Sequence, residues 1–198
     1  TITDSLEANR VESLMGIVNG TTNYILSRMS DGGESYDQVL CEAQATGLAE
    51  PDPKSDVEGY DAAYKLSILA SLAFHACVPF DCIYREGITK IEPIDLALGK
   101  EMGYALKLLA IAKREGGVIE ARVHPTFIRQ NHPLASVSGS FNAIFLRGHA
   151  CEEMMLFGRG AGSAPTSSAV AGDMLFAARQ SSPRNPTFVN DNRLSGEL

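Results

Sequence analysis

Two prolines set close together divide the first half of the chain and limit how it can fold. Pro51 and Pro53 lie in an acidic segment, residues 50–56, between two helix-like patterns. Each proline restricts its own backbone and that of the residue before it. We therefore expect residues 50–56 to form a stiff acidic loop. The preceding helix is expected to begin at a capping box made by Ser35 and Gln38 and to end at Gly47.

Helical patterns dominate the rest of this half. The strongest one covers residues 60–76, where large apolar residues and small ones recur every three or four positions, as on one helix face. Residues 11–30 carry a second helical pattern, which is interrupted at Asn19 and Gly20. Both segments are expected to be helices.

Strand patterns gather in the second half of the chain. The expected strands are residues 87–92, 104–114, 118–128, 141–146 and 152–157, and the expected helices are 93–101 and 165–179. Gly116 and Gly117 favour a hairpin between the second and third of these strands. Helices first and strands later predict an α+β fold, with a mixed sheet covered by helices on one face. Residues 181–198 are expected to be a loose polar tail.

Charge and composition exclude several classes of protein. The 198 residues include 17 Lys and Arg against 24 Asp and Glu, a net charge of -7. This balance disfavours nucleic acid and anionic membranes as partners. The four cysteines form no CxxC pair, so we expect reduced, partly buried thiols in a cytoplasmic protein. The four histidines share no ligand spacing, so no metal site is predicted.

Asp61 and Lys65 are the first candidates for chemistry, because they stand four apart on the strongest helix. An exposed pair of this kind is common and contributes only about 0.3–0.5 kcal/mol. The small and apolar neighbours Ala62 and Ala63 favour the wall of a crevice instead. There the lysine could donate or accept a proton. Glu50, on the stiff loop, could bind a cationic group such as an amine.

Two glycine-containing segments are further candidates. Gly20 and Thr21 offer backbone N–H groups and a hydroxyl that could hold a carboxylate, or they could simply begin a helix. The glycines at 158, 160 and 162 do not match a dinucleotide-binding GxGxxG motif, because Ser163 replaces the last glycine. They predict a tight turn before a helix whose N-terminus could accept a phosphate.

Taken together, these residues resemble the catalytic domain of homoserine dehydrogenase. The resemblance covers about residues 11–180 and is carried by the following stretches: residues 16–26; Ala43, Gly47–Pro53, Asp56, Val57, Gly59–Asp61 and Lys65; residues 132–135 and 141–144; and residues 158–162, 165 and 166. Leu48 departs from the pattern, since many relatives carry an aromatic residue there. The resemblance implies a reversible NAD(P)-dependent reaction between L-homoserine and L-aspartate 4-semialdehyde, on the route to threonine and methionine.

The resemblance also implies a role for each candidate residue. It assigns proton transfer to Lys65 with Asp61 as its partner, substrate contacts to Glu50, Gly20, Thr21 and Asp56, and cofactor contacts to Gly160, Gly162 and Thr166. It implies a homodimer formed through the sheet, with residues 1–180 as the substrate-binding and dimerisation domain. The family's nucleotide-binding domain has no counterpart in the 198 residues, so we expect the chain to be inactive alone. A non-catalytic binding or dimerisation module and a different reductase are the alternatives.

Overall fold

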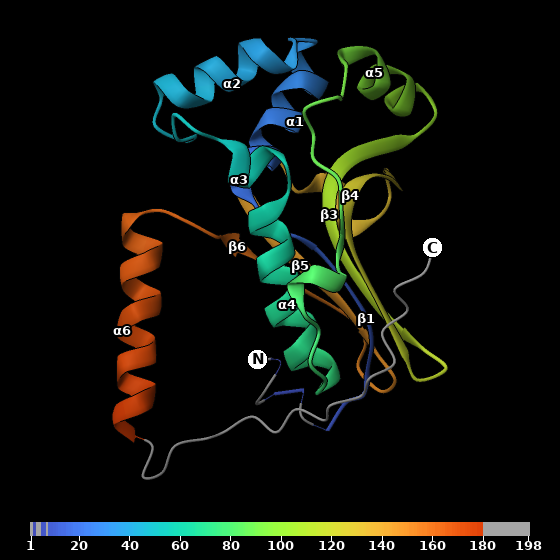
Figure 1. The fold of residues 1–198 in the computed structure, drawn as a ribbon, viewed down its shortest axis with the longest axis vertical. Coiled ribbons are helices and arrows are strands. Elements are labelled where there is room, and N and C mark those ends of the chain that lie inside the picture. The colour runs from blue at the N-terminus through green and yellow to red at the C-terminus, as the bar shows by residue number, and fades with distance from the viewer. Residues whose placement is uncertain (1, 3–4, 7, 180–198) are drawn as a thin grey trace.

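Six strands form one mixed sheet in the order β2-β4-β3-β1-β5-β6 (Figure 1). Neighbouring strands are antiparallel, except that β2 runs parallel to β4. The strands are β1 (Val11–Ile17), β2 (Tyr84–Arg85), β3 (Tyr104–Glu115), β4 (Val118–Arg129), β5 (Phe141–Gly148) and β6 (Glu152–Arg159). The computed structural model describes residues 2, 5–6 and 8–179, so the expected C-terminal tail lies outside the described residues.

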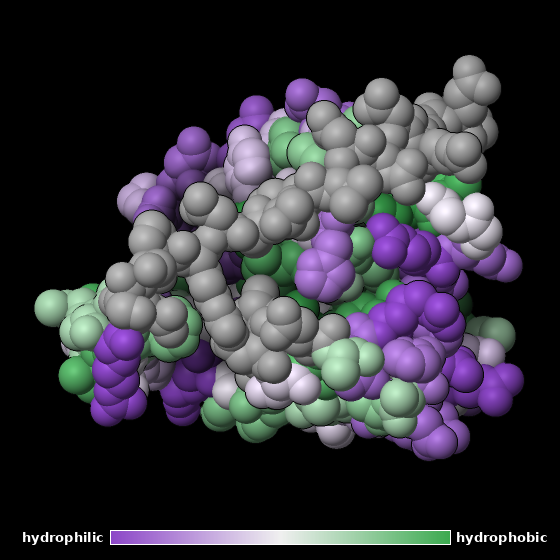
Figure 2. All heavy atoms as spheres, turned by 90° about the horizontal axis from the view of Figure 1, so that it is seen from below, coloured by the Kyte–Doolittle hydropathy of each residue, from purple (hydrophilic) through white to green (hydrophobic). Residues whose placement is uncertain are grey.

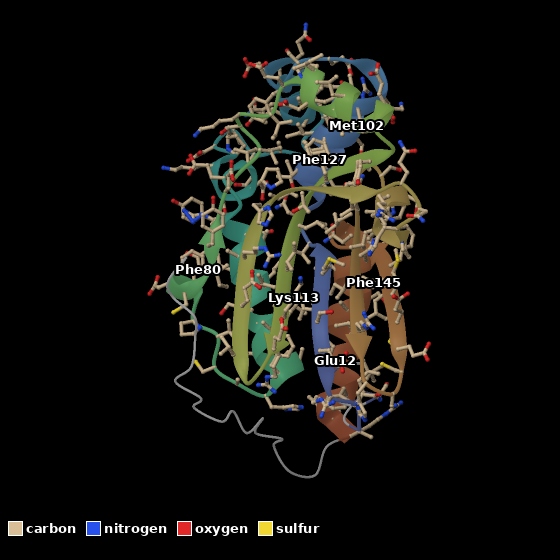
Figure 3. All side chains as sticks on the ribbon, turned by 90° about the vertical axis from the view of Figure 1, so that its right-hand side faces the viewer. Glu12, Phe80, Met102, Lys113, Phe127 and Phe145 are labelled. Atoms are coloured by element: carbon tan, nitrogen blue, oxygen red, sulfur yellow. The ribbon has the colours of Figure 1, made fainter. Side chains whose placement is uncertain are left out.

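Helices lie on one side of this sheet, which confirms the predicted α+β architecture. They are α1 (Gly20–Gly32), α2 (Tyr36–Ala45), α3 (Lys54–Val57), α4 (Tyr60–Phe74), α5 (Pro93–Glu101) and α6 (Ser163–Arg179), with short 3-10 turns η1 (Phe80–Cys82) and η2 (Pro133–Ser136). Figure 3 shows α4 and α6 behind the same face of the sheet. Helix α4 packs on β3 and β4 through Ala63, Leu66 and Ala70, which are completely buried. No helix among the described residues is long and apolar enough to cross a membrane.

The opposite face of the sheet has its own apolar cluster. This second cluster consists of Ile17, Leu109, Ile111, Ile128, Leu134, Val137, Ala143 and Phe145. The short turn η2 covers part of it by packing on β3 and β4. Among the described residues no helix covers the rest of this face, as the view onto Lys113 and Phe145 shows (Figure 3). The sheet is therefore apolar on both faces, although helices cover only one.

Strand β1 corrects the helix expected over residues 11–30. The helix begins only at Gly20, and residues 11–17 form the strand that lies between β3 and β5. Leu14 packs into the main core, whereas Ile17 packs into the second cluster. A central strand that is buried on both faces reads as a continuous apolar run, and a bulge between Val11 and Ser13 further obscures its alternation.

Two other expectations were wrong in detail. Residues 54–57 form the single turn α3, so the irregular part of the acidic loop ends at Pro53. Residues 87–92 are not a strand: the strand is Tyr84–Arg85, and the backbone N–H of Ile88 instead donates to the carbonyl of Val57, at 2.8 Å. The N–H of Ile88 is thus taken up by the α3 turn, and the N–H of Ile91 by the carbonyl of Ile88, rather than by the sheet.

The cysteines also differ from expectation. All four are free thiols, but Cys41, Cys77 and Cys82 are exposed, and only Cys151 is partly buried.

Other predicted elements are confirmed. Ser35 and Gln38 form the capping box of α2, and the hairpin turns at Gly116 and Gly117. Helix α5 covers residues 93–101 as expected, and β5 pairs with β6.

Helix α4 ends on a residue with a strained backbone, which allows a stability prediction. His75 is exposed and adopts a left-handed conformation with φ of 52°. Glycine adopts this conformation without steric cost. We expect His75→Gly to raise the free energy of unfolding by about 0.5–1 kcal/mol, measured by urea unfolding. His75→Ala is the matched control and should give no gain, because alanine keeps the steric cost; an equal gain would refute the backbone explanation.

Candidate active site

Asn19 joins three elements at the end of β1. Its side-chain carbonyl accepts a hydrogen bond from the backbone N–H of Thr22, at 2.9 Å, and so caps α1. Its amide donates to Asp56 Oδ1 at 2.7 Å and to Asp61 Oδ2 at 3.0 Å. The side chain is buried, so these bonds form in a low-dielectric setting where they hold geometry well. Asn19 therefore fixes two carboxylates, one from α3 and one from α4, beside the start of α1.

Lys65 completes this group from the next turn of α4. Its Nζ lies 2.7 Å from Asp61 Oδ2 and 3.0 Å from the carbonyl oxygen of Val18. The side chain of Lys65 is 45% exposed, so this is not a sealed salt bridge. An ammonium has three donors, and two are directed at these partners. The third is available to an oxygen that enters from solvent.

Glu50 approaches the same region on the loop before α3. Gln44 holds the loop by donating from Nε2 to the carbonyls of Glu50 and Pro51, each at 3.2 Å. Thr21 ties the loop to α1 through a 3.4 Å bond from its hydroxyl to the carbonyl of Leu48. The Glu50 side chain is exposed and has no hydrogen-bond partner among the described residues. It is a free carboxylate on a restrained backbone, suited to an ammonium ligand.

Gly20 is required by close packing at the first turn of α1. A Cβ added there would lie 2.9 Å from the carbonyl oxygen of Ser140. The same Cβ would lie 3.6 Å from Asn142 Oδ1, and a Cβ on Gly160 would collide with the amide of Asn142. Asn142 thus lies between the glycine proposed for substrate and one proposed for cofactor.

Asn142 is a site residue to which the sequence alone assigned no role. Its Oδ1 is buried and has no hydrogen-bond partner among the described residues. A buried acceptor without a partner costs about 1–3 kcal/mol, and such atoms are often completed by a ligand. The place of Asn142 in the site is visible only from its contacts with Gly20 and Gly160, because Gly20 lies far from it in sequence.

Gly162 and Thr166 lie at the beginning of α6. Gly162 has a φ of 122°, and its carbonyl accepts from the N–H of Thr166 at 3.0 Å. Both residues are exposed, and no hydrogen bond between described residues joins them to Lys65 or Glu50. The structure therefore brings Gly20, Asp56, Asp61 and Lys65 together around Asn19, and the Thr21 hydroxyl bonds the loop that carries Glu50. Gly160 lies beside Asn142 near Gly20, whereas no hydrogen bond between described residues joins Gly162 or Thr166 to this group.

Helix α6 itself has no buried residue. Its large apolar side chains Val170, Met174, Leu175 and Phe176 are at least half exposed. Apolar side chains gather over this helix at the left of the molecule in Figure 2. Helix α6 therefore presents an apolar surface directly after the glycine-rich turn.

The bridging role of Asn19 gives a paired prediction. Asn19→Asp keeps an N-cap acceptor but replaces the amide donor by a third carboxylate beside Asp56 and Asp61. We expect this change to lower turnover of the full-length protein by about tenfold or more. Asn19→Ala should also lose the cap, costing about 1–2 kcal/mol of stability. Steady-state kinetics and urea unfolding separate the effects; normal turnover in Asn19→Asp would contradict the proposed link between the carboxylates.

Comparisons with known proteins identify the class to which this site belongs. A homoserine dehydrogenase from Mycobacterium leprae is 50% identical over 183 residues, which are 90% of this chain and 42% of that protein. The crystal structure of a homoserine dehydrogenase from Thiobacillus denitrificans superposes with a TM-score of 0.91 at 43% identity, covering 98% of this chain and 47% of that one. Both relatives are dehydrogenases, which are oxidoreductases, and this chain matches a part of each of them.

The family can be stated as well. The sequence profile described as homoserine dehydrogenase matches residues 1–175. The chain therefore belongs to the homoserine dehydrogenase family, and it spans less than half the length of the curated relatives it matches. A hyperthermophilic archaeal homoserine dehydrogenase mutant, solved in complex with NADPH, superposes with a TM-score of 0.74 at 29% identity over 89% of this chain and 50% of that one.

Proposed function

We propose that this chain is the substrate-binding and proton-transfer part of an enzyme that interconverts L-homoserine and L-aspartate 4-semialdehyde with NAD(P). The observation that carries the proposal is the Asp61–Lys65 pair, which Asn19 holds beside the first turn of α1. Membership of the homoserine dehydrogenase family supports the same reaction.

The charges of the site match those of homoserine. The substrate carries an ammonium, a carboxylate and a hydroxyl. The free carboxylate of Glu50 suits the ammonium, and the N–H groups of Gly20 and Thr21 at the start of α1 suit the carboxylate. Lys65 is left to contact the hydroxyl oxygen, while Asp56 stays fixed by Asn19 and supplies a second acceptor. Each polar group of the substrate then has a partner of opposite character.

Lys65 would move the proton of the reaction. In the oxidative direction the substrate hydroxyl gives its proton to the amine form of Lys65 Nζ, while the C4 hydrogen leaves as hydride and the C–O bond becomes a carbonyl. In the reductive direction the ammonium form returns the proton to the alkoxide oxygen. Asp61 keeps Nζ in position at 2.7 Å. NAD(P), when bound, accepts or supplies the hydride.

The residues around Asn142 fit a nicotinamide cofactor. The unpaired acceptor Oδ1 of Asn142 needs an N–H donor, and the carboxamide of nicotinamide carries one. A Cβ on Gly160 would collide with the amide of Asn142, so only glycine lets the Asn142 side chain lie against this turn. Gly160, Gly162 and Thr166 would therefore contact the cofactor, together with Asn142. The apolar surface of α6 would then pack against the domain that holds most of the nucleotide.

A homodimer through the helix-free face of the sheet is part of the proposal. That face carries part of the second cluster and a cross-strand row of Glu120, Lys113, Ser13, Arg147 and Glu153. A second copy turned by a two-fold axis that crosses the row between Lys113 and Ser13 would set Glu120 opposite Arg147 and so pair opposite signs. Sedimentation velocity on the full-length protein should give a dimer; a monomer at micromolar concentration would refute the proposed homodimer.

The four free cysteines support a reducing, cytoplasmic location.

Turnover of L-homoserine by the full-length protein is the direct test. Reduction of NAD⁺ or NADP⁺ should depend on L-homoserine and not on L-serine or L-threonine, because only homoserine places its hydroxyl on C4. Binding of L-homoserine without turnover would favour a non-catalytic binding module instead. Turnover of another alcohol in preference to homoserine would favour a different reductase.

A further inference from the structure

Lys107 is a buried lysine that the proposed reaction does not use. It lies on β3 and is only 6% exposed. Its Nζ donates to the carbonyl oxygen of Val137 at 2.6 Å and to Asn23 Oδ1 at 3.2 Å. Burial lowers the pKa of its ammonium to about 8. An amine and an ammonium can both donate to two acceptors, so the hydrogen bonds do not depend on the charge.

Asn23 extends this contact from α1. It is 2% exposed, and its amide donates to the carbonyls of Val137 at 3.3 Å and Phe141 at 3.0 Å. One turn further along α1, the hydroxyl of Ser27 accepts from the N–H of Gly139 at 3.2 Å. The segment Val137–Phe141 between η2 and β5 is therefore tied to α1 at three points, and Lys107 joins it to the sheet.

The same segment ends at the site. Ser140 is the residue whose carbonyl packs on Gly20, and Asn142, two residues later, is the neighbour of both Gly20 and Gly160. A shift of this segment would therefore move the residues that pack behind the first turn of α1. It would leave Lys65 in place, since that side chain is held by Asp61 and Val18.

A buried lysine costs free energy that a purely structural position does not require. Burial of an amine costs free energy unless its donors are satisfied, and an apolar residue of similar size would fill the space at lower cost. Among the described residues no carboxylate hydrogen-bonds to Lys107, which rules out a buried ion pair within them. What the lysine supplies is a donor that reaches two acceptors on different elements.

We propose that Lys107 is a positioning residue for the substrate site, which acts by holding the segment Val137–Asn142 against the first turn of α1. The proposal rests on the proposed function, because it concerns the binding of the same substrate. Lys107 touches neither the substrate nor the reacting atoms. Its loss should therefore weaken binding and leave the proton transfer almost unchanged.

The test compares KM and kcat in the full-length protein. Lys107→Met should raise KM for L-homoserine about tenfold or more, with kcat changed by less than about threefold. Lys90→Met is the matched control, since it removes an exposed lysine outside the site. Ile119→Ala is the second control, because it removes core volume near the far hairpin turn and destabilises the domain without touching this segment. Both controls should keep the KM of the wild type.

A milder variant keeps the proposal testable if Lys107→Met does not fold. Ser27→Ala removes one of the three ties in a helix where alanine is favourable, and it should raise KM about two- to fivefold. An unchanged KM in both Lys107→Met and Ser27→Ala would overturn the proposal. An equal rise of KM in Ile119→Ala would also overturn it, since general destabilisation would then explain the effect.

Hydrogen exchange separates this proposal from the proposed function. The backbone amides of residues 137–142 should exchange faster in Lys107→Met than in Lys90→Met, whether or not the protein turns over homoserine. Faster exchange without any homoserine turnover by the wild type would support the positioning role of Lys107 and refute the proposed reaction. Equal exchange rates in the two variants would overturn the positioning role of Lys107 itself.

Discussion

Lys65→Met in the full-length protein should lower kcat for L-homoserine oxidation by about 10²–10⁴-fold, the usual contribution of a positioned acid or base. The side chain of methionine preserves the length of the stem but has no proton to transfer. The fold should be kept, because Lys65 is almost half exposed and its pairing with Asp61 adds at most about 0.5 kcal/mol. Steady-state rates with saturating homoserine measure the effect.

Lys65→Arg distinguishes proton transfer from simple charge. Arginine can still pair with Asp61, but it stays protonated at any physiological pH. We expect the arginine variant to be folded and almost as slow as Lys65→Met. Lys100→Met, at the exposed end of α5, is the control and should keep wild-type rates. Recovery of near-normal kcat in Lys65→Arg would show that Lys65 supplies charge and not a proton.

Gly87→Ala should be the most damaging small substitution for the fold. A Cβ at this position would collide with the carbonyl oxygen of Val57 and lie 2.5 Å from the Cα of Glu58. Both are backbone atoms, so the clash cannot be relieved by a side-chain rotation. We expect a loss of about 3 kcal/mol or more in the free energy of unfolding. Turnover should fall as well, because the displaced turn leads directly to Asp61.

Gly172→Ala is the matched control for this change. An added Cβ there has no neighbour within 4 Å, and the residue lies inside α6. Alanine is the better helix former, so stability should stay equal or rise by up to about 1 kcal/mol. Urea unfolding of both variants gives the comparison. A Gly87→Ala protein as stable as Gly172→Ala would mean that α3 and the segment after β2 do not pack as described.

The contact at the centre of the candidate site could be predicted from the sequence because it depends on local spacing. Asp61 and Lys65 are one helical turn apart, so their contact follows from the helix pattern alone. The hairpin of β3 and β4 was predictable for a similar reason, since both strands flank one turn. Contacts of this kind can be predicted because the residues that form them are close together in the sequence.

Other features depend on contacts between distant segments and could not be predicted. Asn19 looks like a simple helix cap in the sequence, whereas its amide bridges to Asp56 and Asp61 about 40 positions later. Asn142 lies in a stretch that carries the resemblance, but no local pattern gives either Asn142 or Lys107 a role. The strand β1 was hidden because both of its faces are buried, which removes the alternation that marks most strands.

The place of β1 in the sheet has a consequence for synthesis of the protein. It is the first described strand to leave the ribosome, yet both of its partners come much later: Ser13 pairs with Lys113, and Gly16 pairs with Ile144. Until then its backbone edges stay unpaired, which is a state open to chaperones and to aggregation. Nascent chains that stop before β3 should therefore be digested readily by protease. Protection of Asn19 and the residues that follow should appear only once β5 has emerged.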